Sequence, residues 1–503
     1  MTLGERLSGT AAAYPRRVAL AFEGRKYSYR ELDGLVSAFA RGLAGQGVGE
    51  GDRVALLLPN CPEFAVAYFG ASRAGAVVVP VNTFLAAPEM LFILKDSGAS
   101  LVVVSSEHHE KLARIKDALP GLKAVSTGPG LPGALDFKSL LEEGKNDAPG
   151  TGVERGRQTG ASPDDAPAAI LYTSGTTGNP KGAVLSHGNL LSNASACAEA
   201  FRVTKKDRFL LFLPMFHAFS FLVCLLLPLT LGARVIILPS VKPFSRVIKA
   251  IIFGGATFFI AIPTVYSVLS MKKFPRIVFP LLRLRLCVSG AAPLPREVIE
   301  RFARNYPVPL LEGYGLTEAS PVVSCNPLDG TRKPGSAGIP IPGVEVRAVS
   351  EDGAALPPGQ VGEIAVRGHN VMKGYLNNPS ATAEAIRDGW LFTGDLGYVD
   401  DEGYIYIVDR KKDLIIVHGM NIYPREVEEA LYTHPAVRQA AVVGVPDPGK
   451  GETPKAFVAL HEGTSLTEKE VKAYLRERVA GYKVPRQVEF VESLPVSPTG
   501  KVL

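Results

Sequence analysis

Cysteine is scarce in this chain of 503 residues, and its five copies form no paired pattern. They lie far apart in sequence, no C-x-x-C pair occurs, and the positions are Cys61, Cys197, Cys224, Cys287 and Cys325. This spacing argues against the disulfide framework of a small secreted protein and against a zinc-ligand pattern. We therefore expect reduced, buried thiols in a cytoplasmic protein.

The chain also has only a small excess of positively over negatively charged residues. The chain has 55 Lys and Arg against 49 Asp and Glu, a net charge of +6, and the bases form no long run. Nucleic acid is therefore not an expected partner. A mild positive charge still favours polyanionic cofactors or anionic lipid, so weak peripheral membrane contact stays open, as does a homodimer. The N-terminal stretch "MTLGERLSGTAAAYPRR" lacks the apolar region of a signal peptide, which agrees with a cytoplasmic location.

Long hydrophobic runs are absent except at residues 209–233. This stretch carries no Asp, Glu, Lys or Arg and exceeds the length that a membrane-spanning helix needs. Pro214, His217, Pro228 and Gly232 interrupt it, however. We expect a buried helix or the wall of a substrate tunnel.

The pattern of apolar segments predicts an α/β protein. Segments that read as strands, such as "RVALLLP" (residues 53–59), alternate with segments that read as helices, such as "PEFAVAYFGASRAG" (residues 62–75). This alternation is typical of parallel sheets covered by helices. From residue 335 to 410, short β segments with glycine turns predict a small barrel-like subdomain. An α+β unit follows, in which Thr467 and Glu470 predict a capping box at the start of a helix.

One glycine-rich stretch, "ILYTSGTTGNPKGAVLSHGNL" (residues 170–190), has the composition of a phosphate-binding loop. Glycine allows backbone N–H groups to approach an anion, the hydroxyls can donate to phosphate oxygens, and Lys181 adds a mobile positive charge. The spacing is not that of a Walker loop. It is not a nucleophile elbow either, because Tyr172 stands where the first glycine would be. Taken alone, the stretch could equally be a surface turn.

Four further motifs follow in order along the chain. They are "EGYGLTEAS" (residues 312–320), "GWLFTGDLG" (389–397), "DRKKDLIIVHGMNIYPREVE" (409–428) and the terminal "LPVSPTGKVL" (494–503). Together with the glycine-rich stretch, this ordered set resembles the adenylate-forming superfamily of acyl-CoA synthetases, firefly-type luciferases and peptide-synthetase adenylation domains. The segment "SPVVSCNPLDGTRKPGSAGIPIPGVEV" (320–346) is most similar to bacterial medium- or long-chain fatty-acid–CoA ligases.

The resemblance implies both a fold and a reaction. Residues 1–409 would form a large N-terminal domain of two helix-covered, mainly parallel sheets, with the barrel-like subdomain at 335–409. Residues 410–503 would form a small, mobile α+β domain. A hydrophobic carboxylic acid would attack the α-phosphate of Mg²⁺-bound ATP, giving acyl-AMP and pyrophosphate, and CoA would then displace AMP.

The resemblance also implies roles in the nucleotide site. Glu318 would bind Mg²⁺, which prefers oxygen ligands beside phosphate, and Thr317 would donate to the α-phosphate. Tyr314 would stack on adenine, and Asp395 and Arg410 would contact the ribose. The full set implied for ATP or AMP is Thr173, Ser174, Gly175, Thr176, Thr177, Lys181, Gly290, Ala291, Ala292, Glu312, Gly313, Tyr314, Gly315, Asp395 and Arg410.

For the acid, the resemblance points to His217 in "PMFHAFS", which would take the place of a gate beside the acyl carboxylate. A core histidine is the alternative. The implied acyl pocket contains Phe216, His217, Phe219 and Gly313. The pocket segments carry no charged residue, which argues against an amino-acid substrate.

The remaining implied roles fall in the C-terminal domain. Lys501 in "PTGK" would bridge the acyl carboxylate and the α-phosphate and so stabilise the transition state. With Thr317, Glu318 and His217 it completes the implied catalytic set. Lys412 would be the hinge. The segment that lines the pantetheine tunnel would contain His418, Gly419 and Met420.

Two other classes of function remain as alternatives. One is a different adenylating enzyme, either an aryl-CoA ligase or a ligase that loads a carrier protein. The other is a non-catalytic nucleotide- or lipid-binding relative. The second would be favoured if Lys501, Glu318 or Lys181 were missing, and all three are present.

Overall fold

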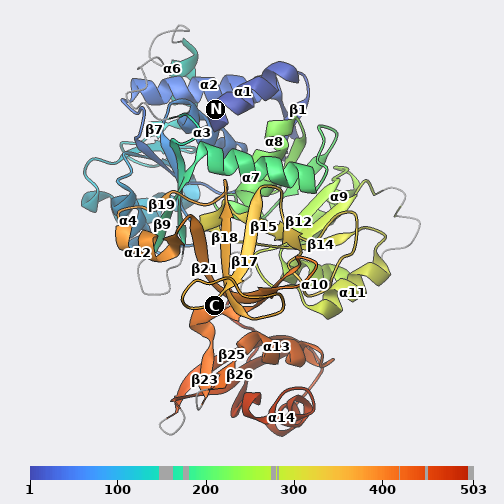
Figure 1. Ribbon diagram of the computed structural model, residues 1–503. Helices are drawn as coiled ribbons and strands as arrows, with labels where there is room; N and C mark the ends of the chain where they lie inside the picture. Colours follow the sequence, from blue (N-terminus) through green and yellow to red (C-terminus); the bar gives the residue numbers. More distant parts are fainter. Residues whose placement is uncertain are drawn as a thin grey trace.

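The computed structural model describes residues 1–146, 162–173, 180–272, 279, 282–417, 420–447 and 451–496. Figure 1 shows a large body, coloured blue to orange, and a smaller orange-red unit that contains helices α13 and α14. The large body is built around two sheets in which parallel strands dominate.

The first sheet has eight strands in the order β19-β9-β8-β4-β3-β5-β6-β7. The strands from β8 to β7 are parallel, whereas β9 and β19 run antiparallel at one edge. Their bounds are Arg53–Leu57 (β3), Val77–Pro80 (β4), Leu101–Val104 (β5), Lys123–Ser126 (β6), Leu135–Asp136 (β7), Pro167–Thr173 (β8), Lys181–Ser186 (β9) and Gly374–Tyr375 (β19).

The second sheet has nine strands in the order β16-β15-β14-β13-β12-β10-β11-β1-β2. The central strands from β14 to β1 are parallel, and both edges are antiparallel. Their bounds are Val18–Phe22 (β1), Arg25–Ser28 (β2), Arg208–Leu211 (β10), Arg234–Ile237 (β11), Phe258–Ala261 (β12), Leu286–Ser289 (β13), Leu310–Gly315 (β14), Val322–Cys325 (β15) and Ile339–Pro340 (β16).

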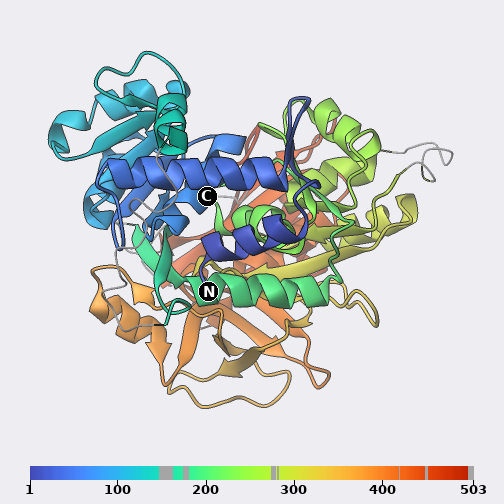
Figure 2. The same ribbon diagram turned by 90° about the horizontal axis from the view of Figure 1, so that it is seen from above.

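Helices cover both sheets, as the alternating pattern predicts. Their bounds are Leu3–Ala13 (α1), Tyr29–Gly45 (α2), Pro62–Arg73 (α3), Ala87–Ser97 (α4), His109–Ala113 (α5), Phe137–Asn146 (α6), His187–Ala200 (α7), Phe244–Ile252 (α9), Pro263–Met271 (α10) and Arg296–Asn305 (α11). Figure 2 shows α1 and α7 next to each other near the N-terminus, where the N–H of Leu3 donates to Nδ1 of His187. Capping boxes start α2 at Ser28 and α7 at Ser186, which satisfy the first free N–H groups of each helix.

The apolar run at residues 209–233 folds as strand β10, a π-helix (η3, Ser220–Leu226) and helix α8 (Leu227–Leu231). All seven residues of the π-helix are buried, so the predicted buried helix is confirmed. Within the described part of the chain, no helix combines the length and the apolar character needed to span a membrane.

The segment predicted to be barrel-like folds as a curled, antiparallel sheet. Its strands are β17 (Val344–Val349), β18 (Gly362–Gly368), β20 (Ile386–Arg387), β21 (Trp390–Val399) and β22 (Ile405–Arg410), and helix α12 (Pro379–Ala385) precedes β20. The predicted α/β fold class is confirmed.

The C-terminal unit has its own sheet, in the order β24-β23-β26-β25, with β27 beside β26. The capping box predicted at Thr467 is present. Its own cluster of buried residues includes Val427, Val458 and Leu475. The bounds are Ile415–Val417 (β23), Met420–Ile422 (β24), Pro424–Tyr432 (α13), Val437–Asp447 (β25), Gly451–Leu460 (β26), Glu468–Arg476 (α14) and Gln487–Phe490 (β27).

Candidate active site

The predicted site residues meet where the parallel strands of the second sheet end. Gly290 follows β13, Thr317 follows β14, and the segment with His217 follows β10. Ligands of open α/β sheets bind at the carboxyl ends of the strands, so this edge is the expected place for a site. Residues more than 70 positions apart in sequence come together here because parallel strands bring their ends to one edge.

One polar cluster joins the two sheets around Glu318, which lies in the short helix η5 (Thr317–Ala319). The hydroxyls of Tyr375 and Thr173 donate to Glu318 Oε1, at 2.9 and 3.3 Å. The Nζ of Lys181 lies 5.3 Å from the centre of the Tyr375 ring, within cation–π range. Three predicted residues are thus brought together at the ends of β8 and β9.

Tyr375 is a member of this cluster that the sequence analysis did not identify. It lies on β19, which pairs with β9 and so places its ring beside Lys181. Burial, followed by the charge of Glu318, raises the pKa of Tyr375 above its ordinary value, so the hydroxyl keeps its proton and acts as a donor. The sequence offered no signal for it, because Tyr375 stands 57 residues beyond Glu318 and outside every quoted motif.

A second polar cluster connects the large sheet to the curled sheet. The Tyr314 hydroxyl donates to Asp395 Oδ2 at 2.6 Å, and Nε of Arg410 lies 3.2 Å from Asp395 Oδ1. Asp395 and Arg410 face each other in the register of β21 and β22. Burial and the Asp395 carboxylate raise the pKa of Tyr314 well above its ordinary value. Asp395 is 5% exposed, so its carboxylate is a pre-positioned acceptor rather than a solvated turn residue.

Glu312 holds the loop that follows β13. Its Oε1 accepts from the N–H of Leu294 at 2.9 Å, whereas its Oε2 is buried without a hydrogen-bond partner in the described structure. Burial raises the pKa of Glu312 to about 7, and the Leu294 N–H and the charge of Arg425 oppose that rise. The carboxyl group therefore fixes the position of the loop that carries Gly290, Ala291 and Ala292.

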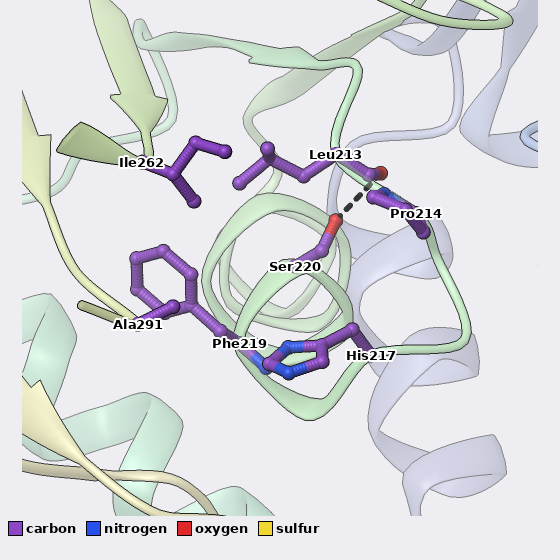
Figure 3. A pocket seen from close by; sticks show the side chains of 7 residues that line it. All are labelled: Leu213, Pro214, His217, Phe219, Ser220, Ile262 and Ala291. Carbon is purple, nitrogen blue, oxygen red and sulfur yellow. Dashed lines mark hydrogen bonds between the residues drawn. The ribbon is translucent and has the colours of Figure 1, made fainter. Parts of the chain in front are cut away.

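An apolar cavity lies directly beside this loop (Figure 3). It encloses about 200 Å³, including the part open to solvent, and is lined by Leu213, Pro214, His217, Phe219, Ser220, Ile262 and Ala291. A Cβ atom on Gly290 would stand 2.9 Å from the Phe219 ring, so only glycine leaves room for that ring. Ala291 has a φ of 70°, a left-handed conformation that costs a non-glycine residue energy.

His217 and Phe219 are the predicted acyl-pocket residues that line this cavity. Nδ1 of His217 accepts from the N–H of Phe219 at 3.3 Å, and burial lowers the pKa of His217 to about 4. The imidazole is therefore neutral near pH 7. The ring of Phe216 packs instead against the exposed Phe84, with centroids 6.2 Å apart, and Gly313 lies against Ser324 of β15.

The connection to the C-terminal unit is polar. Lys412 is exposed in the short helix η6 (Lys411–Asp413), directly after β22. Asp409 Oδ2 accepts from the N–H of Arg425 at the start of α13, and Nη1 of Arg425 donates to the Ile407 carbonyl. Burial raises the pKa of Asp409.

Several predicted residues lie outside the described residues. These are Ser174, Gly175, Thr176, Thr177, His418, Gly419 and Lys501, and only the backbone of Met420 is described. All five cysteines are free, four of them buried and Cys61 half-buried.

No group of three His, Cys, Asp or Glu side chains is arranged to hold a metal in the part of the chain that the structure describes. A hard cation here would need ligands from a bound phosphate as well as Glu318. That requirement fits Mg²⁺, which is commonly held by one or two carboxylates together with substrate phosphates.

The AMP-binding enzyme family model matches residues 7–376, and the model of the AMP-binding enzyme C-terminal domain matches residues 426–501. The chain therefore belongs to the AMP-binding enzyme family, as the ordered motifs predicted. The C-terminal match ends at Lys501.

Three relatives illustrate its place in the family. The chain is 38% identical to a long-chain-fatty-acid–CoA ligase of Bacillus subtilis, over 100% of this chain and 93% of that protein. It is 40% identical to a feruloyl-CoA synthase of Amycolatopsis, over 97% of this chain and 95% of that protein. The crystal structure of ATP-bound MatB from Rhodopseudomonas palustris aligns with a TM-score of 0.89 and 33% identity, covering 100% of this chain and 97% of that one.

Proposed function

We propose that the protein is an ATP-dependent fatty-acid–CoA ligase that forms acyl-AMP and then acyl-CoA. The observation that carries this proposal is the position of an apolar, uncharged cavity immediately beside a preassembled polar cluster. Ala291 of the loop after β13 lines the cavity, and Glu312 accepts a hydrogen bond from the N–H of Leu294 in the same loop. A nucleotide and a hydrophobic acid would meet across this loop.

On the nucleotide side, each described residue has a defined task. Asp395 would accept from the ribose hydroxyls, exchanging its bond from Tyr314 for bonds from the ligand, and Arg410 would hold the carboxylate in place. Thr173 and Lys181 would contact phosphate oxygens. Glu318 would hold Mg²⁺, which neutralises phosphate charge when bound.

On the acid side, a neutral His217 suits a gate beside a carboxylate that must attack the α-phosphate of ATP, where it forms the mixed anhydride acyl-AMP as pyrophosphate leaves. A protonated imidazole would form an ion pair with the substrate carboxylate and weaken it as a nucleophile. The pKa of about 4 keeps His217 neutral at the pH of the reaction. Phe219 lies across the cavity, so a long chain requires this ring to move.

The C-terminal unit would supply the catalytic cation. Lys501 would stabilise the charge that develops on the α-phosphate, and the unit would then turn about Lys412 so that the segment of residues 418–420 faces the thiol of CoA. We place the domain boundary between Asp409 and Arg410, with the curled sheet of residues 335–409 belonging to the N-terminal domain. Hinge closure of this kind concentrates the φ and ψ changes in a few residues.

An aryl acid is the second candidate substrate. The 40% identity to a feruloyl-CoA synthase favours it. Loading of a carrier protein in place of CoA would leave the first half-reaction unchanged.

The deciding experiment measures pyrophosphate release for octanoate, dodecanoate, hexadecanoate, ferulate and benzoate, each with and without CoA. We expect the straight-chain acids to be used best, with a first pyrophosphate that does not need CoA and turnover that does. A clear preference for ferulate or benzoate would replace the fatty-acid proposal with the aryl one. Absence of acid-dependent pyrophosphate release would overturn the adenylation mechanism.

A further inference from the structure

Basic residues are concentrated in one segment of the chain. Residues 201–295 contain 13 Lys and Arg but only one acidic residue, Asp207. The rest of the chain contains 42 Lys and Arg against 48 Asp and Glu. The mild net charge of +6 therefore combines a segment of +12 with a remainder of −6. Asp207 adds little negative potential outside, since it is buried against Arg285.

The topology gathers many of these bases at one edge of the second sheet. Arg208 and Arg234 begin the neighbouring parallel strands β10 and β11 and are partners in register. The N–H of Arg285, just before β13, donates to the carbonyl of Thr257, just before β12. Parallel strands start at the same edge, so these side chains share it.

Few acidic side chains neutralise the basic residues at this edge. Arg17 and Arg208 donate to backbone carbonyls, Arg208 to Gly254 at 3.2 Å. Across the described residues, no acidic side chain forms an ion pair with Arg17, Arg208, Arg234 or Arg283. Burial lowers the pKa of Arg234, and so do the like charges of Arg208 and Arg17, which shows how closely the cations are crowded.

An exposed aromatic residue stands among these cations. Phe253, at the end of α9, is 83% exposed, and α9 lies beside β12 in Figure 1. The guanidinium of Arg208 donates to the carbonyl of Gly254, which directly follows Phe253. The Arg283 side chain lies beside Gly255.

Cations around an exposed apolar tip fit the surface of an anionic membrane. Basic residues are drawn to acidic headgroups, and an aromatic ring is stable at the boundary between headgroups and acyl chains. A nucleic acid or an acidic protein would satisfy the charges. Neither would explain why the most exposed large hydrophobic side chain of the described structure lies among them.

We propose that this basic edge docks the protein on an anionic lipid bilayer, with Phe253 inserted at the level of the headgroups. The basic edge consists of Arg17, Lys205, Arg208, Arg234, Lys249, Arg283 and Phe253. The candidate active site lies at the opposite ends of the same strands. The docked protein therefore turns its nucleotide site toward the water. The inference does not depend on which acid the enzyme activates.

The test uses the full chain and two kinds of vesicle, one of phosphatidylcholine alone and one of phosphatidylglycerol and phosphatidylcholine in equal parts. We expect sedimentation with the second kind only, and release by high salt, which screens surface charges. The variant Lys205→Glu with Lys249→Glu and Arg283→Glu should lose roughly 100-fold or more in vesicle affinity, given about fivefold for each basic residue. Phe253→Ser should lose several-fold.

Matched controls separate the surface from the overall charge. The variant Lys95→Glu with Lys138→Glu and Lys469→Glu changes the net charge equally at exposed sites on α4, α6 and α14, and Phe490→Ser removes another exposed ring. Both should bind vesicles like the parent. All variants should keep the parent's pyrophosphate release with octanoate in solution, which also shows that they are folded.

Three results would overturn the proposal. They are equal binding to both kinds of vesicle, equal loss in the patch and control triple variants, and no vesicle binding combined with patch-dependent binding of duplex DNA or heparin.

Discussion

The large N-terminal body and the C-terminal unit are built differently. The body buries one extensive apolar cluster that reaches both large sheets, and three further clusters. It also holds the described polar contacts of the candidate nucleotide site, apart from the one that Arg410 makes with Asp395. The C-terminal unit has a small core of its own. Its described hydrogen bonds to β22 go through Arg425, at the Asp409 carboxylate and the Ile407 carbonyl.

This difference suggests a division of labour. A site that must bind ATP and an acid in fixed geometry belongs on rigid, well-packed elements. A unit with its own core and polar contacts to its neighbour can change its position without exposing apolar surface. We therefore expect changes in the body to alter ligand use in general, and changes in the C-terminal unit to alter one half-reaction at a time.

The largest expected effect comes from the two lysines of the C-terminal unit. Lys501→Ala should slow adenylation by the order of 10² to 10³-fold, as loss of a preorganised charge-stabilising donor does. Thioester formation from supplied acyl-AMP should survive. Lys412→Pro should do the reverse, because proline would fix φ in the proposed hinge. The measurement is the rate of each half-reaction separately.

Lys412→Ala is the control for the proline variant, since it removes the charge and leaves the backbone free. It should retain both half-reactions. If Lys501→Ala and Lys412→Pro lose the same half-reaction, the proposed division between the two parts of the molecule is wrong.

Next in size is the pH dependence of stability that Glu312 contributes. Its folded pKa of about 7 lies above the ordinary 4.5, so the folded state holds this proton more tightly than the unfolded state. The contribution is therefore complete below pH 4.5 and is lost as the pH rises through 7. The free energy of unfolding changes by roughly 3 kcal/mol over this window, from 1.36 kcal/mol per pKa unit.

In the variant Glu312→Gln, the side chain cannot ionise but can still accept the hydrogen bond from the N–H of Leu294. Its melting temperature should fall less than that of the parent between pH 5 and pH 8, and the two proteins should converge toward pH 4.5. Scanning calorimetry across this range checks the prediction. Parallel melting curves at every pH would show that Glu312 does not titrate in this window.

A change at Asp395 tests the contribution of the N-terminal body to both half-reactions. Asp395→Ala should lower kcat/KM for ATP by roughly 10- to 100-fold, because hydrogen bonds to a charged group contribute about 1.5–3 kcal/mol. Unlike Lys501→Ala, it should also weaken the use of supplied acyl-AMP, which carries the same ribose. Tyr314→Phe, which removes only the hydroxyl bonded to Asp395, is the milder control. Unchanged kinetics in Asp395→Ala would remove Asp395 from the site.

The smallest expected effect is on acid preference. Phe219→Ala removes the ring that stands beside Gly290 in the cavity, and should raise kcat/KM for longer acids relative to octanoate by about 10-fold, the scale of a few methylene contacts. Phe216→Ala, which changes a ring packed on Phe84, should leave the preference nearly unchanged. A chain-length profile measured with saturating ATP distinguishes them. The same shift in both variants would place the acyl chain elsewhere.

Local patterns were enough to predict much of this protein. The strand "RVALLLP", the helix from Pro62 and the capping box at Thr467 follow from apolar spacing and side-chain hydrogen bonds within a few residues, and the structure has them. Five ordered motifs likewise identified the family, because each motif is a short stretch whose chemistry can be read without knowing its neighbours.

Contacts between distant segments could not be read in this way. Tyr375 reaches Glu318 only because β19 pairs with β9, and the sequence contains no sign of that pairing. The mild net charge of the whole chain gave no sign of the segment of residues 201–295, which has a net charge of +12. These basic residues form one surface only because the parallel strands start at a common edge of the sheet. Residue types and their local order determined which chemistry this chain can perform. Strand pairing and helix packing, which act between residues of any separation, decided which side chains share a site and which share a surface.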